Sequence, residues 1–539
     1  MSVLRYHEQT KHHFHRFARS LGYLDWASQP DPFRRYAGAP LVDLAREPVA
    51  ADLPFDLLYQ QTPPRPLTAV TVAEFLRYSL GLSAWKQYGE TRWALRVNPS
   101  SGNLHPTEGY VVSAVPGLGA HSASPDASVF HYAPREHALE RRCVLDGGAW
   151  RSFAGDAAAV TFLVGLTSIH WREAWKYGER AFRYCQHDAG HAIAALRYAA
   201  ALLGWHMALL PRWSHADVGT ILGTDAAGTQ AEAEEAECVA IVTAGDVRPF
   251  LGADPAPLVE AASRARWEGQ PNVLSPEHTA DWPVIEEAAA ATRFPGISVP
   301  ATTSVRRVLA DPASRSPSPS TGAGEIILRR RSATGYDGQT TLPVGVFFRM
   351  LDRLRGGVPL DALWWTPHVN VIFFVHRVDG LPPGIYAFVR SDLPGFRASC
   401  REDLLWEPIS GAKDLYLLAP LDSRAIAQRL SCDQAIASEG VFAAAMLART
   451  AASLQEYGDW FYRCLFWECG TIGQVLYLEA EAAGVRGTGI GCFYDDPVHD
   501  LLGLSGHRWQ SLYHFAMGGH VEDTRLTTEP GYPWEGTKG

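Results

Sequence analysis

Residues 175–204 read WKYGERAFRYCQHDAGHAIAALRYAAALLG, and this stretch decides the fold. It is rich in alanine and leucine, which favour helices, and it ends at Gly204, a residue type that often closes a helix. The stretch therefore predicts one long helix. Short apolar runs at 160–166 and 238–243 predict buried strands on either side of it, and Thr71–Leu80 has the apolar spacing of an amphipathic helix.

The same pattern returns 280 residues later. At this offset ten positions carry the same or a similar residue: Tyr177 and Tyr457, Gly178 and Gly458, Arg183 and Arg463, Asp188 and Glu468, Gly190 and Gly470, Leu196 and Leu476, Ala200 and Ala480, Gly204 and Gly484, Leu222 and Leu502, and Gly223 and Gly503. With an offset of 272, Val72, Phe75 and Arg77 meet Val344, Phe347 and Arg349. Such an ordered series indicates a tandem duplication, which is typical of a pseudo-dimer with an approximate two-fold axis.

The repeat and the composition divide the chain into four segments. We expect an N-terminal arm at 1–60, a first repeat at 61–250 and a second repeat at 325–539. Between the repeats, residues 251–324 are rich in proline, alanine and serine, which is typical of a linker, above all in its second half.

Composition excludes several classes of function. The net charge of −10 gives no basic surface, so nucleic-acid binding is disfavoured. Eight cysteines in 539 residues, none in C-x-x-C spacing, do not form a disulfide framework or a zinc site. The basic, histidine-rich run 11–16 fits a surface helix better than a metal site, and we predict no metal. No apolar run is long enough to span a bilayer and no signal peptide is evident, so we expect a cytoplasmic protein without a membrane partner.

The polar motifs of the two repeats are complementary. The first repeat has the rigid polar loop Asn98-Pro99-Ser100-Ser101-Gly102-Asn103-Leu104-His105-Pro106-Thr107-Glu108, where the second has Leu360–Trp364. The second repeat has Arg329-Arg330-Arg331-Ser332, a set suited to a phosphate monoester, where the first has Leu58-Tyr59-Gln60. It also has the glycine-rich run 487–493, predicted to be a loop that approaches a flat ligand. A single site built from both repeats is therefore predicted, with its equivalent lost.

Together with the tail Gly518–Leu526, these motifs resemble the FMN-dependent nitroreductase superfamily, and most closely a tandem form of the SagB/ThcOx-type dehydrogenases. The resemblance covers roughly 60–250 and 325–530. It implies an α+β fold, with a mostly antiparallel sheet flanked by helices in each repeat. It also implies a monomer that contains an internal pseudo-dimer.

The resemblance further implies the residues that hold FMN. Arg330, Arg331, Ser332 and Arg525 match the phosphate ligands, and Pro99, Ser100, Ser101 and Asn103 match the loop that reaches the isoalloxazine from the partner subunit. Gly489, Ile490 and Gly491 match the segment that faces the ring. The G-x-G-x-x-G spacing of a dinucleotide fold is absent, which favours FMN over NAD as the resident cofactor.

Lys176 and Tyr177 resemble the catalytic pair of the azoline dehydrogenases, although Lys176 and Arg180 also fit surface positions at a helix start. Arg96 is a candidate for the cation near flavin N1. We expect an FMN-dependent oxidoreductase that transfers hydride through N5 between a small molecule and NAD(P)H or another donor. Two alternatives stay open: a tandem flavin-storage protein without turnover, and a scaffold that binds no flavin.

Overall fold

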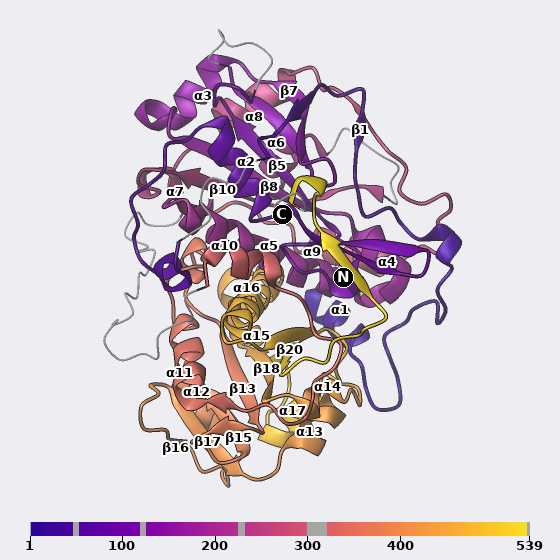
Figure 1. Cartoon of the computed structure of the whole chain (residues 1–539), viewed down its shortest axis with the longest axis vertical. Coiled ribbons are helices and arrows are strands. Elements are labelled where there is room, and N and C mark those ends of the chain that lie inside the picture. Colours follow the sequence, from indigo (N-terminus) through magenta and orange to yellow (C-terminus); the bar gives the residue numbers. More distant parts are fainter. Residues whose placement is uncertain (1, 47–52, 119–125, 225–231, 299–320, 536–539) are drawn as a thin grey trace.

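The computed structural model describes residues 2–46, 53–118, 126–224, 232–298 and 321–535. Each half of the chain forms a seven-stranded antiparallel sheet flanked by helices (Figure 1). The first sheet has the order β2 (Leu41–Asp43), β7 (Ala138–Val144), β6 (Ser128–Ala133), β5 (Thr107–Ser113), β8 (Thr161–Ser168), β10 (Glu235–Thr243) and β9 (His206–Leu209). The second has the order β16 (Glu407–Pro408), β17 (Leu415–Pro420), β15 (Gly384–Phe388), β13 (Val369–Val375), β18 (Phe442–Ala448), β20 (Gln510–Gly518) and β19 (Arg486–Ile490).

The two sheets confirm the predicted repeat. Starting from β9 and β19, six strands follow the same chain order in both halves, and only the far edge strands β2 and β16 come from different places in the chain. The helices repeat as well. The first half has α2 (Ala69–Arg77), α4 (His170–Tyr177), α5 (Ala181–Leu202) and α6 (His215–Leu222), and the second has α11 (Val344–Arg353), α15 (Thr450–Tyr457), α16 (Phe461–Ala482) and α17 (Pro497–Leu502). The fold is thus α+β with two tandem domains, as predicted.

The remaining elements cover the sheets or join the halves. The helices are α1 (Val3–Gln9), α3 (Gly147–Ala154), α7 (Arg248–Leu251), α8 (Ala256–Arg264), α9 (Pro283–Ala291), α10 (Ala323–Arg329), α12 (Leu393–Ser399), α13 (Arg424–Leu430) and α14 (Ile436–Glu439). The short strands are β1 (Tyr36–Ala37) with β11 (Gln270–Pro271), β12 (Leu342–Pro343) with β14 (Val378–Asp379), and the set β21 (Thr527–Pro530), β3 (Leu82–Tyr88) and β4 (Thr91–Arg96). No helix among the described residues is long and apolar enough to cross a membrane.

The two long helices α5 and α16 pack against each other between the sheets (Figure 1). They meet at Gly190 and Gly470, which are equivalent residues of the repeat. A Cβ atom on Gly190 would lie 2.4 Å from the carbonyl oxygen of Trp467, and one on Gly470 would lie 2.3 Å from that of His187. Only glycine therefore allows this approach, and the pseudo-two-fold axis passes near the crossing.

The interface between the halves is a core and not a surface contact. One continuous apolar cluster contains Val164 and Leu196 of the first half together with Phe373 and Leu476 of the second. Burying this area is the main favourable term in joining the halves.

Two buried ion pairs also bridge the interface, and their arginines are equivalent in the repeat. Arg183 of α5 lies 2.6 Å from Asp495, and Arg463 of α16 lies 3.0 Å from Glu237. Because all four side chains are buried, removal of one partner would leave an uncompensated charge.

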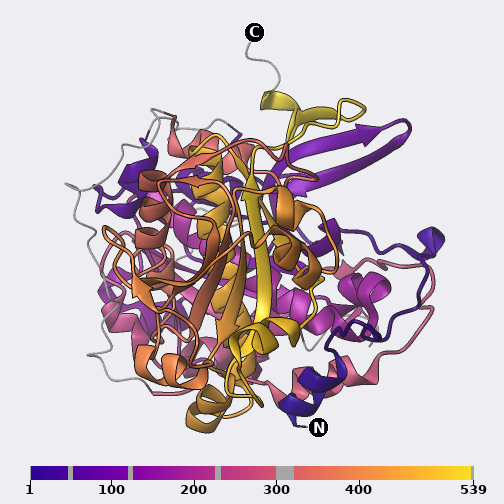
Figure 2. The ribbon, with the colours of Figure 1, turned by 90° about the horizontal axis from the view of Figure 1, so that it is seen from below.

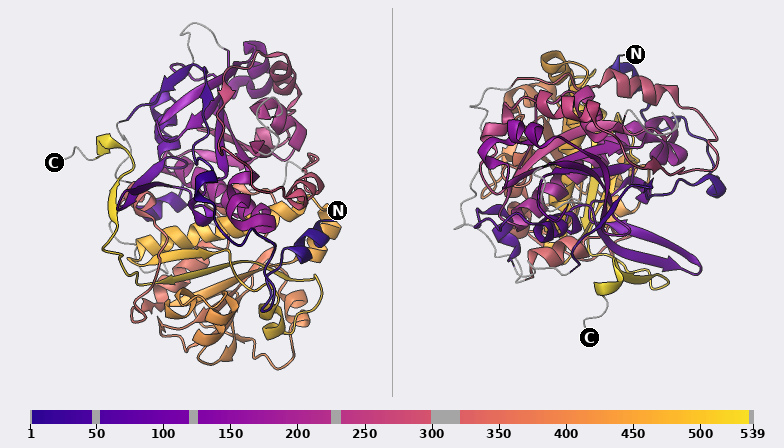
Figure 3. Two further views of the ribbon diagram at one scale, coloured as in Figure 1. Left: turned by 90° about the vertical axis from the view of Figure 1, so that its right-hand side faces the viewer. Right: turned by 90° about the horizontal axis from the view of Figure 1, so that it is seen from above.

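Both ends of the chain cross to the opposite half. Helix α1 packs on the second half, where the imidazole of His7 lies 2.8 Å from Gln510 Oε1 and 2.9 Å from the Tyr462 hydroxyl. Strand β21 pairs with β3 of the first half. The β3–β4 hairpin projects from the body, with the C-terminal segment beside it (Figure 2). Figure 3 shows the C-terminal strand running along the edge of the molecule to the first half.

Two sequence predictions need correction here. The helix predicted over 175–204 is broken at Gly178, which has φ +56 and whose Cβ would lie 2.3 Å from the Arg19 carbonyl oxygen. The linker predicted over 251–324 contains α8 and α9, so its first half is packed structure. Leu258 and Ala262 of α8, and Ile285 of α9, are buried. Residues 299–320, which hold the serine- and proline-rich run, lie outside the described residues.

We predict that Gly190→Ala destabilises the protein although alanine is the better helix former by roughly 1 kcal/mol. Its Cβ must displace the backbone of α16, and overpacking of this kind costs roughly 1–3 kcal/mol. Gly335→Ala is the matched control, since nothing lies within 4 Å of its Cβ position. Urea unfolding monitored by circular dichroism checks this. Equal stability of the two variants would contradict the tight crossing.

Candidate functional site

A cavity of about 450 Å³ lies between the two halves and is lined by both. The first half contributes side chains from the β3–β4 hairpin, the loop 98–105 and helix α5. The second half contributes residues 330–334, 486, 488–492, 521–523 and 526, together with Gln434, Tyr477 and Tyr513. Most of the predicted site residues line this cavity: Pro99, Ser100, Ser101, Asn103, Tyr177, Arg330, Arg331, Ser332, Gly489, Ile490 and Gly491.

Arg330 and Arg331 bring positive charge to the cavity, Arg330 from a buried position and Arg331 from a partly buried one. The Arg330 guanidinium donates to the carbonyl oxygens of Val97 (3.1 Å) and Arg96 (3.1 Å), and that of Arg331 donates to the Ser83 carbonyl oxygen (2.9 Å). Among the described residues, neither guanidinium forms an ion pair with a carboxylate. Burial lowers the pKa of Arg330, and burial together with the charge of Arg330 lowers the pKa of Arg331 to about 9.

Hydrogen bonds join the glycine-rich segment 487–493 to Ser332 and Ala333, which directly follow the two arginines. The Ala333 amide donates to the Gly487 carbonyl oxygen, and the Tyr477 hydroxyl contacts Ser332 Oγ (2.8 Å) while it accepts from the Gly489 amide (2.8 Å). Residues 486–490 form edge strand β19, so the predicted loop begins only at Gly491. A Cβ on Gly489 would overlap the Tyr513 hydroxyl, so this close approach requires glycine.

The loop 98–105 enters from the opposite side. Gly102, Asn103 and His105 have φ values of 59, 61 and 52, a left-handed conformation that favours glycine and asparagine. The Ser101 amide and hydroxyl donate to the carboxylate of Asp188 on α5, each at 3.0 Å. The loop thus stays in one conformation because helix α5 holds it. Glu468, the equivalent of Asp188 in the repeat, accepts from the backbone of His368 and Val369 in the same way.

Lys176 and Tyr177 lie at the end of α4, against the same loop. The Cβ position of Gly102 is 2.5 Å from the Tyr177 hydroxyl oxygen and 3.1 Å from Lys176 Nζ. Tyr177 lines the cavity, and burial raises the pKa of its hydroxyl. Lys176 is half-buried behind the loop and is not part of the lining.

Arg525 does not fit its predicted role. Its side chain is 70% exposed, forms an ion pair with Asp523 at 2.7 Å and stacks on the Tyr88 ring. Asp523 and Leu526 on either side of it do line the cavity. The tail therefore reaches the cavity as predicted, but the Arg525 guanidinium is not part of the lining. It is paired instead with the carboxylate of Asp523, two residues earlier.

Several cavity residues were missed by reading the sequence. Tyr184, Asp188 and His191 project from one face of α5, a spacing that the sequence contains but that also fits core packing. Arg96, predicted only as a candidate cation, lines the cavity as well. Lys86 and Trp93 come from the projecting hairpin, and Arg486 from β19. Nothing local in the sequence indicates that these three approach the site.

Asp188 and Glu173 are unusual acids behind the loop. Burial raises the pKa of Asp188 to about 7, although hydrogen bonds from Ser100 and Ser101 oppose the shift. Burial and the nearby Asp188 raise the pKa of Glu173 well above its usual range. Both Glu173 oxygens lack a hydrogen-bond partner within the described part of the chain, so no hydrogen bond there stabilises the ionised carboxylate.

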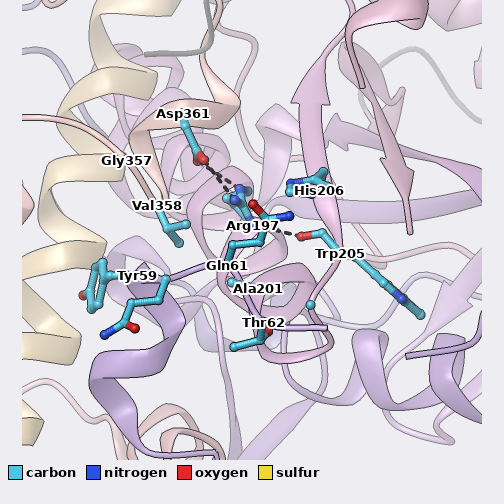
Figure 4. A pocket seen from close by; sticks show the side chains of 12 residues that line it. Tyr59, Gln61, Thr62, Arg197, Ala201, Trp205, His206, Gly357, Val358 and Asp361 are labelled. Carbon is cyan, nitrogen blue, oxygen red and sulfur yellow. Dashed lines mark hydrogen bonds and ion pairs between the residues drawn. The ribbon is translucent and has the colours of Figure 1, made fainter. Parts of the chain in front are cut away.

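The pseudo-equivalent position, which is also built from both halves, has different chemistry (Figure 4). Arg197, which stands 280 residues before Tyr477, forms a bidentate ion pair with Asp361 at 2.9 Å, and both side chains are 5% exposed. This pair lies between a small pocket of about 40 Å³ and an outer groove of about 580 Å³. The other arginine of the groove, Arg248, pairs with Asp246. The described guanidinium groups are thus compensated here, in contrast to Arg330 and Arg331.

In the described ranges no group of three or more His, Cys, Asp or Glu side chains could hold a metal ion. His12 from the histidine-rich run is buried, and its ring accepts the Ala18 amide.

Comparison with known proteins places the fold. Residues 405–519 match the model of the nitroreductase family. A candidate nitroreductase from Anabaena variabilis is similar over 97% of this chain and 100% of its own, with 21% identity and a TM-score of 0.68. The microcin synthetase McbBCD of Escherichia coli matches 38% of this chain and 70% of its own at 19% identity, with a TM-score of 0.27. No curated protein matches the sequence. The chain therefore has the nitroreductase fold in both halves, and the part of it that the nitroreductase family model matches lies in the second half.

Proposed function

We propose that the cavity binds one FMN between the two halves and that the protein is an FMN-dependent oxidoreductase. The observation that carries this proposal is the charge of the buried Arg330 and the partly buried Arg331, neither of which has a carboxylate partner among the described residues. Burying such charges is costly unless an anion compensates them, and a phosphate monoester supplies two negative charges and several acceptor oxygens. The Ser332 hydroxyl is a further donor for a phosphate. The Nε atoms of Arg96 and Arg486 add two more, since neither has a hydrogen-bond partner within the described residues.

The rest of the lining suits a flat, polar ring system. The cavity volume of about 450 Å³ falls within the range of roughly 300–1,000 Å³ that is usual for small-molecule sites. Glycines 489 and 491 allow backbone approach from the second half, and the loop 99–103 offers hydroxyl and amide groups from the first. When bound, FMN supplies two-electron transfer through N5. The donor and the acceptor are proposed to be small molecules, with NAD(P)H as one candidate donor.

The chain's own residues would handle protons and position the substrate. Asp188, with a pKa of about 7, can hold or release a proton behind Ser101, and a general acid is most effective when its pKa is close to the working pH. Tyr177 presents its hydroxyl beside Gly102 at the cavity wall, and Lys176 lies behind it. We propose Tyr177 as the group nearest to a substrate and Lys176 as the residue that sets its electrostatic environment.

Flavin storage without turnover is the second candidate function. The β3–β4 hairpin and the tail 521–526 both contribute to the cavity lining. Segments placed in this way would cover a bound flavin, which favours storage. Anaerobic mixing of the FMN-loaded protein with NADH or NADPH separates the two functions. We expect loss of the oxidised flavin absorbance with at least one of them. In a second experiment, the protein is reduced with dithionite and mixed with a quinone or a nitroaromatic acceptor. If NADH and NADPH do not reduce the bound flavin, and these acceptors do not reoxidise it, the protein stores FMN and the enzymatic proposal is wrong.

We predict that Arg331→Gln weakens FMN binding by roughly 10- to 100-fold, because hydrogen bonds to a charged group contribute roughly 1.5–3 kcal/mol. Arg329→Gln is the matched control, since Arg329 is 60% exposed and pairs with Glu325 and Glu481. Quenching of FMN fluorescence during titration gives the dissociation constants, and thermal unfolding confirms that both variants fold. Equal affinity of the two variants would overturn the proposed phosphate position.

Asp188 generates a prediction for pH dependence. Its carboxyl is protonated in the folded protein up to about pH 7 but ionises near pH 4 in the unfolded chain, so folding takes up a proton between these values. The stability of the wild type relative to Asp188→Asn should therefore fall as pH rises from 5 to 7, by about 1.4 kcal/mol per pH unit, and then level off. Urea unfolding at several pH values measures this. A constant difference across this range would show that Asp188 is ionised in the folded state.

A further inference from the structure

Two of the eight cysteines lie side by side at the wall of the cavity. The sulfur atoms of Cys432 and Cys492 are 3.0 Å apart, although the residues are 60 positions apart in the sequence. Cys492 follows Gly491 and lines the cavity, whereas Cys432 lies outside the lining and is partly exposed. The other six cysteines are buried. Both members of the pair are partly exposed, and Cys492 alone of the two lines the proposed flavin site.

Hydrogen bonds hold the loop that contains Cys432 against the loop that contains Cys492. The Gln434 side-chain amide donates to the Cys492 carbonyl oxygen at 2.9 Å, and the Tyr494 amide donates to the Leu430 carbonyl oxygen at 2.9 Å. Cys432 and Asp433 have φ values of 53 and 60, an uncommon conformation for residues with a side chain. Such strain persists only where the surroundings impose it, and it concentrates at functional sites. An approach of about 1 Å would bring the sulfur atoms to the bond length of a disulfide.

The charges around the pair make its two members unequal. The hydrogen bond that Cys492 shares with Cys432, together with the nearby Arg180 guanidinium, lowers the pKa of Cys492, and the same hydrogen bond raises the pKa of Cys432. Arg180 is held in place by Asp495 at 2.9 Å and donates to the Gly491 carbonyl oxygen at 3.4 Å. A thiolate beside a thiol is the arrangement from which disulfides form and exchange.

We propose that Cys432 and Cys492 are a redox-active pair that exchanges two electrons with the flavin and with a thiol or disulfide compound in solution. This inference rests on the proposed FMN site. In the inward direction, the dithiol gives two electrons and two protons to oxidised FMN, and the S–S bond forms as both S–H bonds break. In the outward direction, the disulfide takes two electrons and two protons from reduced FMN, and its S–S bond breaks.

Because Cys432 is only partly exposed, its external partner must be a small compound. A low-molecular-weight disulfide can reach Cys432 from solvent, where the dithiol reduces it to two thiols and becomes the disulfide. A dithiol compound runs the same exchange in reverse. Cys492 is the sulfur that faces the cavity, so electrons pass between solvent and the flavin site without the external compound entering the cavity.

The test uses the full-length protein, oxidised with excess oxidised glutathione and then freed of it. Alkylation after denaturation and peptide mass mapping should show a Cys432–Cys492 cross-link, with the other six cysteines still free. Anaerobic dithionite titration of the FMN-loaded oxidised protein should then consume four electrons per FMN. The double variant Cys432→Ser/Cys492→Ser should consume two, because it can form neither the internal disulfide nor a mixed disulfide with glutathione at these positions. Cys400→Ser is the control and should still consume four, because Cys400 lies apart from the pair and burial raises the pKa of its thiol to about 12.

The outcomes separate this inference from the function on which it rests. Free thiols at both positions after oxidation would overturn the pair, whatever the flavin does. A cross-link that survives while the flavin takes only two electrons would overturn the electron exchange. Failure of the wild type to bind FMN would remove the proposed function and the exchange together, and the mass map would then still show whether the cysteines oxidise.

Discussion

The backbone contact between α5 and α16 at Gly190 and Gly470 is the constraint on which the rest of the structure depends. Helices can approach this closely only where both present glycine, and here the two glycines are equivalent positions of the repeat. The contact sets the distance between the sheets, and with it the width of the space beside each helix. It also directs Tyr184, Asp188 and His191 of α5 to one side of the axis, toward the strand β19 of the other half.

A two-fold arrangement creates two equivalent positions, and the chain has diverged at them. On one side, Arg330 and Arg331 keep positive charge without a carboxylate partner in the described chain. On the other side, Arg197 and Asp361 neutralise each other across the interface. The same geometry therefore gives a position prepared for an anion and a position closed by an ion pair. Breaking that pair would be destabilising, since it is almost fully buried. We infer that the second position now serves to join the halves.

The sequence predicts the parts of this structure that rest on repeated or local patterns. The 280-residue offset predicts the tandem domains, because packing at the axis requires the same residues twice. The polar motifs at 98–108 and 329–332 predict the two sides of the cavity, which the structure brings together. The missed features depend on distant partners. The break at Gly178 requires Arg19, the exposed position of Arg525 follows from Asp523, and the cysteine pair needs two loops that only the fold brings together. Helices α8 and α9 were missed because alanine-rich helices and alanine-rich linkers share a composition.

The central claim is that one composite site exists per chain, built from both repeats. The most direct measurement is the number of FMN molecules bound per chain, obtained from flavin absorbance and quantitative amino-acid analysis of the FMN-saturated protein. We expect one. A value of two would contradict the single composite site, because the position closed by Arg197 and Asp361 would then have to bind flavin as well, and a value of zero would contradict FMN binding at the cavity.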